Sequence, residues 1–251
     1  MYIWHLNIYK GAVFMSEAFY VPDGTTIVSK YIIPYGEDTV ILPDSVKEIA
    51  DNAFQNNEFL QKIVIRNGIE RIGKLAFSCC EKLSQIFIPN TVTEIGSNAF
   101  TACKALRRAY MPDSITSLGA LVFWCCSNLE EVRLPKNITE IPNSFFAGCS
   151  KLKKVTIPNS VKRIGRGAFS NCESLEEINI PDSVEEIDDY AFTCCTSLKK
   201  IIVSKETEFG DSIPHLCENL AIIKLPVNVR HVGTFAFALC NSLSGAQNID
   251  A

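Results

Sequence analysis

The sequence predicts a repeat solenoid of about nine coils, with a parallel β-sheet on one face and short helical turns or loops on the other. Three observations predict this fold. A phenylalanine recurs every 23 residues, an isoleucine-proline pair recurs in fixed phase with it, and several further apolar columns keep the same period. A single coil cannot bury its apolar side alone, so stacking of coils is expected to build one continuous core.

The phenylalanine column sets the period. Its members are Phe54, Phe77, Phe100, Phe123, Phe146, Phe169, Phe192 and, at the end, Phe237. Between the last two, we assign His215 to the phenylalanine position of a repeat that is one residue short. The segment around each phenylalanine, of the form A-F-x-x-C, contains few β-branched residues. It is therefore expected to form a helical turn or short helix.

A strand is predicted twelve residues before each phenylalanine. Runs such as Ile86-Phe87-Ile88 alternate with period two, so their outer residues point inward and the middle residue faces solvent. A proline usually follows and ends the strand, because it lacks an N–H group. These prolines are Pro43, Pro89, Pro112, Pro135, Pro158, Pro181 and Pro226.

Three further apolar columns complete the predicted core. The first is Val46, Ile69, Val92, Ile115, Ile138, Val161, Val184 and Val229. The second, three residues later, is Ile49, Ile72, Ile95, Leu118, Ile141, Ile164, Ile187 and Val232. The third, six residues after the phenylalanine, is Leu60, Leu83, Leu106, Leu129, Leu152, Leu175, Leu198 and Leu243.

The repeats divide the chain into three parts. Residues 37–243 form the predicted solenoid. Residues 1–36 lie outside the period and are expected to be a capping segment, with a β-hairpin around Pro22-Asp23-Gly24. Residues 244–251 are expected to be a tail or truncated cap without a further strand. The first residues have no basic leader before a clean apolar stretch, so we expect them to belong to the folded chain.

The repeat unit I-P-x-x-V-x-x-I-G-x-x-A-F-x-x-C-x-x-L resembles the BspA-like leucine-rich repeat family over roughly residues 37–243. Proteins of that family are mostly surface or secreted proteins implicated in adhesion to host proteins or other cells. The resemblance therefore implies a binding role at a cell surface, with a protein partner and no cofactor. It supplies no catalytic residues to this chain.

The cysteines are predicted to be packing residues. Eight of the eleven lie in one column, three residues after the phenylalanine when the one-residue deletion is allowed for at Cys217: Cys80, Cys103, Cys126, Cys149, Cys172, Cys195, Cys217 and Cys240. Neighbouring side chains in such a column stand about 5 Å apart, whereas disulfide Cβ atoms are nearer 4 Å. Disulfides and a zinc site are the less favoured alternatives, and the free thiols favour a reducing compartment. Cys79, Cys125 and Cys194 are the candidates for exposed thiols.

The candidate binding site is the outward row of the strands. It consists of Val64, Phe87, Tyr110, Arg133, Thr156 and Asn179. The first three form an apolar and aromatic group of the kind that anchors protein interfaces. The alternative is that the N-terminal cap or a longer loop covers these side chains.

Charged pairs alternate in sign along the two positions before each strand core. From Arg107-Arg108 through Glu130-Glu131 and Lys153-Lys154 to Glu176-Glu177 and Lys199-Lys200, opposite charges fall on adjacent coils. Such a ladder favours correct stacking register and solubility. Ligand binding is the less favoured interpretation, because alternating charges cancel at long range.

Other functions lack sequence signals. The formal net charge of −4 and the absence of a basic cluster argue against nucleic-acid binding, and no apolar run is long enough to span a membrane. Phosphate-loop, metalloprotease and serine-hydrolase motifs are missing, so neither an enzyme nor a metal site is predicted. The leading hypothesis is a non-catalytic protein-binding or adhesion module. The alternative is an architectural protein that self-associates through its open C-terminal coil.

Overall fold

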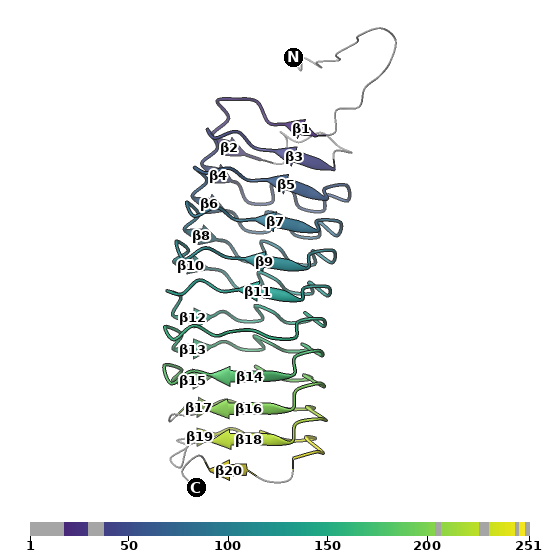
Figure 1. Ribbon diagram of the computed structural model, residues 1–251, viewed down its shortest axis with the longest axis vertical. Helices are drawn as coiled ribbons and strands as arrows, with labels where there is room; N and C mark the ends of the chain where they lie inside the picture. Colours follow the sequence, from purple (N-terminus) through teal and green to yellow (C-terminus); the bar gives the residue numbers. More distant parts are fainter. Residues whose placement is uncertain (1–17, 30–37, 204–206, 226–230, 244–245, 249–251) are drawn as a thin grey trace.

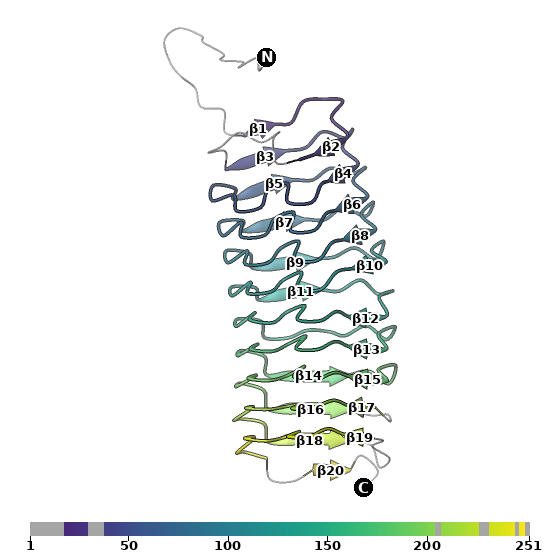
Figure 2. The same cartoon turned by 180° about the vertical axis from the view of Figure 1, so that it is seen from behind.

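The chain folds into a rod of stacked coils. The computed structural model describes residues 18–29, 38–203, 207–225, 231–243 and 246–248. Each coil crosses the long axis of the rod, and its strands pair in parallel with strands of the neighbouring coils (Figure 1). The view from behind shows the same stack of coils (Figure 2). The predicted parallel solenoid of about nine coils is confirmed.

The predicted strand row forms one face of the rod, which we call the strand face. Its first sheet contains β1 (Phe19–Tyr20), β3 (Thr39–Ile41), β5 (Lys62–Val64), β7 (Gln85–Phe87), β9 (Arg108–Tyr110) and β11 (Glu131–Arg133). Its second sheet contains β14 (Glu177–Ile180), β16 (Lys200–Val203), β18 (Ile222–Leu225) and β20 (Ala246–Asn248). A single bridge between Glu131 and Lys154 continues the ladder from the first sheet toward the second.

A second row of short strands, missing from the sequence prediction, forms another face. One sheet contains β2 (Ile27–Val28), β4 (Glu48–Ile49), β6 (Arg71–Ile72), β8 (Glu94–Ile95) and β10 (Ser117–Leu118). The other contains β12 (Glu140–Ile141), β13 (Arg163–Ile164), β15 (Glu186–Ile187), β17 (Glu208–Phe209) and β19 (His231–Val232). A glycine usually follows these strands, because a Cβ there would strike the preceding coil. At Gly96 it would lie 2.5 Å from the Lys74 backbone nitrogen.

The predicted helical turns were wrong, since no segment of the described ranges is helical. The third side of each coil consists of turns in which alternate amides point to different coils. The Phe54 amide donates to the Ala76 carbonyl of the next coil, whereas the Ala53 amide donates to Ala50 within its own coil. Left-handed residues such as Asn52 and Asn56 (φ 61° and 59°) produce this alternation. An α-helix would use these amides within one coil and leave the coils unlinked on this side.

His215 does not fill the phenylalanine slot. The Cys79 amide donates to the carbonyl of Thr101, the residue that follows Phe100 on the next coil. The Cys194 amide makes the equivalent bond to the carbonyl of His215, so His215 is the residue that follows the phenylalanine position. Pro214 therefore occupies the slot and is buried, while His215 is half-buried. The missing residue lies between β16 and β17, because Glu177 pairs with Lys200, 23 residues later, but Glu186 pairs with Glu208, only 22 residues later.

Both ends of the chain differ from the prediction. In place of the expected hairpin, β1 and β2 pair in parallel with β3 and β4 and form a first coil. Residues 1–17 and 30–37 of the predicted cap lie outside the described residues. At the other end, β20 adds a strand beyond Leu243 and pairs with β18, so the expectation of no further strand was wrong.

The core is built from the predicted columns. From Phe54 to Phe192 the phenylalanine rings stack on one another with centroids 4.9 to 6.0 Å apart. Phe145 occupies a position that is alanine in most coils and packs edge-on against the ring of Phe146. The isoleucine, valine and leucine columns are buried around this stack along most of the rod. Leu118 and Leu243 are partly buried, Val232 is exposed, and Val229 lies outside the described residues.

The cysteine column is buried as predicted, and each thiol also donates a hydrogen bond. The Cys80 Sγ lies 3.0 Å from the Phe54 carbonyl of the preceding coil, and the same contact recurs along the column. All eleven cysteines are free thiols. The column thus links successive coils through thiol–carbonyl bonds as well as through packing.

Candidate functional site

The alternation of the strands places the candidate residues on the outside of the rod. On β5, β7 and β9 the central residues Ile63, Ile86 and Ala109 are buried. The following residues, Val64, Phe87 and Tyr110, therefore point away from the core. The pairing of Phe87 with Tyr110 across β7 and β9 sets the two aromatic side chains next to each other.

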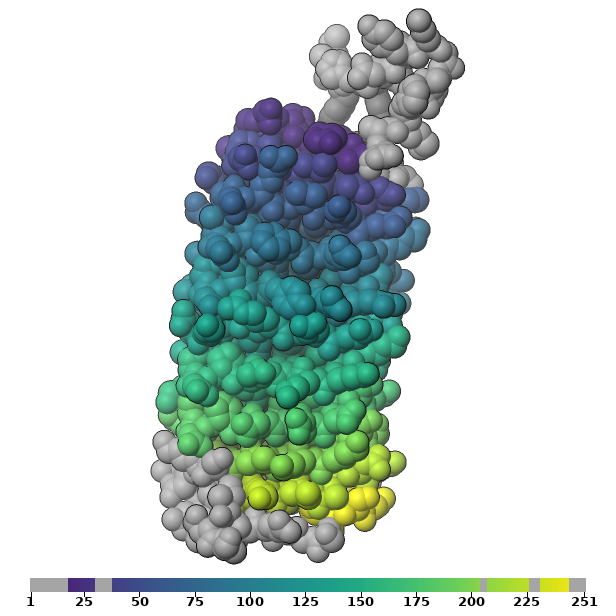
Figure 3. All heavy atoms as spheres, viewed as in Figure 1, coloured from purple at the N-terminus to yellow at the C-terminus, as the bar shows by residue number. Residues whose placement is uncertain are grey.

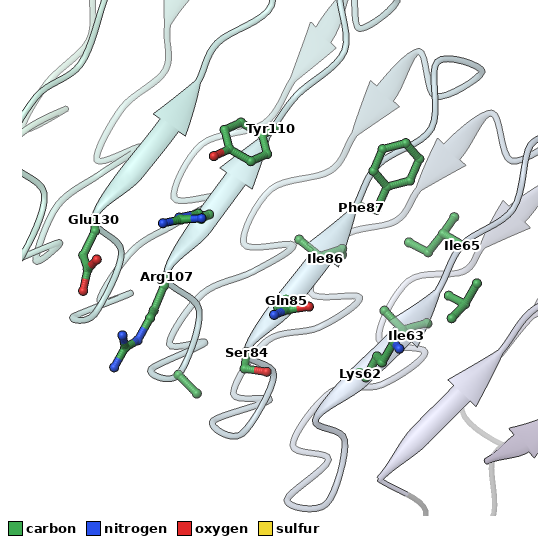
Figure 4. Close-up of a pocket in the computed structure, with 13 residues that line it drawn as sticks. Lys62, Ile63, Ile65, Ser84, Gln85, Ile86, Phe87, Arg107, Tyr110 and Glu130 are labelled. Atoms are coloured by element: carbon green, nitrogen blue, oxygen red, sulfur yellow. The ribbon is translucent and has the colours of Figure 1, made fainter. Parts of the chain in front are cut away.

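Phe87 and Tyr110 are exposed on this face. Phe87 is 70% exposed and Tyr110 43% exposed, whereas Val64 is half-buried. No described residue covers the two rings, so the alternative of a covering cap or loop is not what the described part of the structure shows. Figure 4 shows both rings standing on the outer side of their strands. In the space-filling view the stacked coils form an elongated surface (Figure 3).

A shallow hollow of about 710 Å³ lies over β5, β7 and β9. Its floor contains Val64, Phe87 and Tyr110, and its polar lining contains Lys62, Ser84, Gln85, Arg107, Arg108 and Glu130. In Figure 4 the polar residues Ser84, Arg107 and Glu130 lie toward the beginnings of the strands, and the aromatic rings lie toward their ends. The hollow therefore combines an apolar half with a basic half.

Tyr110 stays protonated as a hydrogen-bond donor. Desolvation, a hydrogen bond to Glu131 and the negative charge of Glu131 raise the pKa of Tyr110 above its ordinary value, against the opposing charge of Arg108. In Figure 4 the hydroxyl of Tyr110 points toward the coil that carries Glu130. The aromatic ring itself remains open to solvent.

Arg133 is held by its own chain. Its Nη1 donates to the Met111 carbonyl at 2.9 Å, and its Nη2 lies 2.8 Å from both carboxylate oxygens of Asp113. The Asp113 pKa is lowered by the Lys136 backbone amide and by Arg133. This candidate residue is thus less available to a partner than its place in the row suggests.

Thr156 and Asn179 lie apart from the aromatic group. Both are exposed and line a second hollow of about 450 Å³ farther along the strand face. The structure therefore separates the six candidate residues into an aromatic group, an internally paired arginine and a polar group. The aromatic group is the part with the features of an interface anchor.

The predicted ladder of opposite charges is present along the strand face. Arg108 lies 3.5 Å from Glu131, Lys154 lies 3.6 Å from Glu177, and Lys199 lies 3.1 Å from Glu176. Each pair joins adjacent coils. These contacts fit the predicted role in stacking register.

A second ladder of charged residues, which the sequence reasoning missed, runs along the second row of short strands. Arg71 contacts Glu48 at 2.5 Å, Asp51 at 2.7 Å and Glu94 at 3.3 Å. Arg163 repeats the arrangement with Glu140, Glu186 and Asp188. The alternating Glu and Arg residues at the 23-residue period were the signal that could have identified it.

The remaining thiols were predicted correctly as the more exposed ones. Cys79, Cys125 and Cys194 are half-buried and lie two residues after the phenylalanine, in left-handed backbone (φ 57° to 59°). In the described ranges, no group of three or more His, Cys, Asp or Glu side chains is arranged to hold a metal ion. A search of the same ranges for a helix with the length and apolarity of a membrane span finds none.

Comparisons with known proteins point to one family. The sequence model of a family described as BspA type leucine rich repeat region matches residues 37–153 and 139–248, with six copies of the repeat. No protein of curated function matches the sequence.

Solved structures are similar over most of the chain. A leucine-rich repeat protein from Bacteroides ovatus is 25% identical over 90% of this chain and 73% of its own, with a TM-score of 0.65. A leucine rich cell surface protein from Faecalibacterium prausnitzii is 22% identical over 95% and 89% of the two chains, with a TM-score of 0.60. The T. pallidum leucine rich repeat protein is 26% identical over 86% and 82%, with a TM-score of 0.51.

Proposed function

Because the chain belongs to the BspA-type leucine-rich repeat family, we propose that it is a non-catalytic binding module that presents its strand face to a protein partner. The observation that carries this proposal is the exposed pair Phe87 and Tyr110. Large aromatic side chains in a hollow are the groups that contribute most to protein interfaces. The family resemblance further favours an adhesion role, with the partner on a host or another cell.

The other candidate residues fit a supporting role. Val64 extends the apolar floor of the hollow, whereas Arg133, Thr156 and Asn179 would lie at the rim of a larger contact. Rim contacts typically exclude water from the anchor and contribute little energy of their own. We therefore expect the aromatic pair to dominate the affinity.

The test is a double substitution, Phe87→Ala with Tyr110→Ala. Proteins captured by the chain are purified, and their affinity is measured by calorimetry. Loss of two anchors is expected to weaken binding about 30-fold or more, corresponding to about 2 kcal/mol. Trp124→Ala is the matched control, because Trp124 is an aromatic residue of similar exposure on the turn side. Unchanged affinity of the double variant would show that this face is not the binding site.

A second candidate function, self-association through the last coil, is favoured by its exposed apolar residues. Val232 is 42% exposed, whereas Phe209 in the same column of the preceding coil is buried. Phe235 and Leu239 are 70% and 57% exposed. Phe235→Ser with Leu239→Ser should then reduce a dimer signal in sedimentation velocity, and a strict monomer of the unsubstituted chain at high concentration would eliminate this function.

A further inference from the structure

The charges of the strand face are balanced in one half and unbalanced in the other. From β9 to β16 the charged pairs of the ladder alternate in sign from one coil to the next, and three ion pairs join adjacent coils. Over β5, β7 and β9 the ladder columns instead contain Lys62, Arg107 and Arg108 without an acidic residue. Lys62 pairs across the sheet with the neutral Gln85.

Two of these cations are without an ion pair among the described residues, although Arg107 lies in the same column as Glu130 of the next coil. Arg108 shares Glu131 across the sheet, but neither Lys62 nor Arg107 forms an ion pair with a described residue. Of the charged residues that line the hollow, three are basic and one, Glu130, is acidic. The hollow therefore has a net positive charge, although the whole chain has a formal net charge of −4.

The same hollow contains an apolar floor that narrows the class of ligand. Phe87, Tyr110 and Val64 offer carbon surface, and Ile65 beneath them is buried. Such a floor contains few groups that can hydrogen-bond to sugar hydroxyls. Burying an apolar side chain against it is favourable by about 25 cal/mol per Å². A peptide supplies such a side chain, whereas an acidic polysaccharide does not.

The spacing of the two halves matches an extended peptide. Lys62 and Val64 lie two residues apart on the same side of β5, and Gln85 and Phe87 do so on β7. Residues two apart in any extended segment are separated by about 6.6 Å. A segment that lies along the strands would therefore place an apolar side chain over Phe87 and Tyr110 and a carboxylate near Lys62 or Arg107.

We infer that the ligand of the strand face is an acidic peptide segment with an aromatic or aliphatic anchor residue two or three positions from its carboxylates. This inference rests on the proposed function and specifies the partner of the same face. The carboxylates complete the charge ladder where this chain leaves it open. The anchor residue covers the exposed aromatic pair.

The test uses random peptides displayed on phage and selected on the full chain. The selected peptides are synthesised with a fluorophore, and their binding is measured by anisotropy. Lys62→Gln with Arg107→Gln removes the two unpaired cations, and Gln is compatible with these columns because Gln61 and Gln85 already occupy neighbouring places in them. The matched control is Lys153→Gln with Lys200→Gln, which makes the same charge change in the same two columns.

The inference predicts acidic selected peptides that contain one apolar anchor. Their affinity should fall about tenfold or more in the Lys62/Arg107 variant at low salt, with a smaller difference at high salt and little change in the control. Neutral or basic selected peptides, an equal loss in the control, or capture of heparin or single-stranded RNA in place of peptides would overturn it.

The outcomes separate this inference from the proposed function. If the peptides require Phe87 and Tyr110 but not Lys62 and Arg107, the face binds proteins and the acidic specificity is wrong. If peptide binding depends on neither pair, both the inference and the proposed function are wrong. Circular dichroism of each variant excludes loss of folding as the cause.

Discussion

At the scale of the residue, each cysteine of the buried column both fills space in the core and donates a hydrogen bond to the preceding coil. The periodic column predicted that these side chains point inward and do not form disulfides. Their hydrogen bonds were not predictable, because the acceptor is a phenylalanine carbonyl 26 residues earlier, such as Phe54 for Cys80. That contact depends on where the turn aims the carbonyl, which no side-chain pattern reports.

The buried thiols predict a loss of stability at alkaline pH. Burial raises the pKa of Cys80 and Cys126 to about 12 from an ordinary value of 9.0, and it also raises the pKa values of Cys103 and Cys149. Above pH 9 the unfolded chain loses these protons while the folded chain keeps them. The free energy of unfolding should therefore fall by about 1.4 kcal/mol per pH unit for each such thiol between pH 9 and the folded pKa.

Urea unfolding at a series of pH values from 8 to about 10 measures this slope. Cys126→Ala removes one of these thiols. The unfolding free energy should then fall less steeply with pH, by about 1.4 kcal/mol per pH unit, whatever the effect of the substitution on stability at neutral pH. An unfolding free energy that stays constant across this range would contradict the assignment of protonated buried thiols.

Two substitutions between glycine and alanine are expected to have opposite effects. Gly96→Ala places a Cβ 2.5 Å from the Lys74 backbone nitrogen, so overpacking should destabilise the fold by about 1 to 3 kcal/mol. Ala102→Gly relieves a left-handed alanine (φ 55°), a strain of about 1 to 2 kcal/mol that exceeds the added entropy of the unfolded chain. Thermal unfolding of the two variants checks the signs. A stabilised Gly96→Ala variant would show that the coils are less tightly spaced than described.

At the scale of the element, the turn side was the part of the fold that the sequence reasoning predicted wrongly. Low β-branching around A-F-x-x-C suggested a helix. The informative signal was the presence of Asn or Gly two residues before and after the phenylalanine, as at Asn52, Asn98, Asn171 and Gly148, since these residues tolerate left-handed backbone. Leu121 and Cys125 adopt the same conformation without that preference, so local propensity alone could not have defined the turns.

A proline lies where the second row of short strands is interrupted between β10 and β12. The amides of Gly119 and Gly165 donate to the Ile95 and Ile141 carbonyls of the preceding coils. Pro142 occupies the same column and has no N–H for the Leu118 carbonyl. One sheet ends at β10 and the next begins at β12, and we expect the missing amide to contribute to this break.

Pro142→Gly should rejoin the two sheets. The new amide is expected to bond to Leu118, a gain of about 0.5 to 1.5 kcal/mol that offsets the greater freedom of glycine in the unfolded chain. Stability should therefore change little, while hydrogen exchange at residue 142 becomes as slow as at Gly119 and Gly165. A rapidly exchanging amide at residue 142 would show that the two coils are separated for another reason.

At the scale of the whole molecule, the charge ladders make the order of the coils matter. Deleting residues 112–134 removes one period and preserves the phase of every apolar column. It also brings Arg107 and Arg108 beside Lys153 and Lys154. In the second row of short strands the same deletion brings Glu94 beside Glu140. Like charges directly opposite each other cost about 0.2 to 1 kcal/mol per pair, so the shortened rod should be less stable than its length alone implies.

The pair Arg107→Glu and Arg108→Glu tests this effect. In the deletion variant it restores opposite charges against Lys153 and Lys154, so it should stabilise the rod by about 1 kcal/mol at low salt. In the full chain it faces Glu130 and Glu131 and should destabilise. Urea unfolding of the four proteins forms a complete cycle. The same sign in both backgrounds would show that the ladder has no role in register.

Fold and site were predictable to different extents because they depend on different information. The apolar columns recur from coil to coil, so a single exception in one coil does not obscure the pattern. The stacked fold could therefore be derived from the sequence. The binding face depends on single, unrepeated residues. The outward positions of Phe87 and Tyr110 followed from strand alternation. The pairing of Arg133 with Asp113 and the Met111 carbonyl depends on the turn after β9, which no repeated residue pattern predicts.

The direction of the inter-coil hydrogen bonds has a mechanical consequence. The strands cross the rod, so the bonds between coils run along its length, and β1 and β20 lie at opposite ends (Figure 1). A pulling force applied at the two ends would act along these bonds and open the coils one after another. It would not load all coils together in shear. Each coil that opens would release about 75 Å of chain. If one end of such a rod is anchored and the other is bound to a partner, the rod would lengthen in steps under tension. This lengthening would lower the force on the contact with the partner.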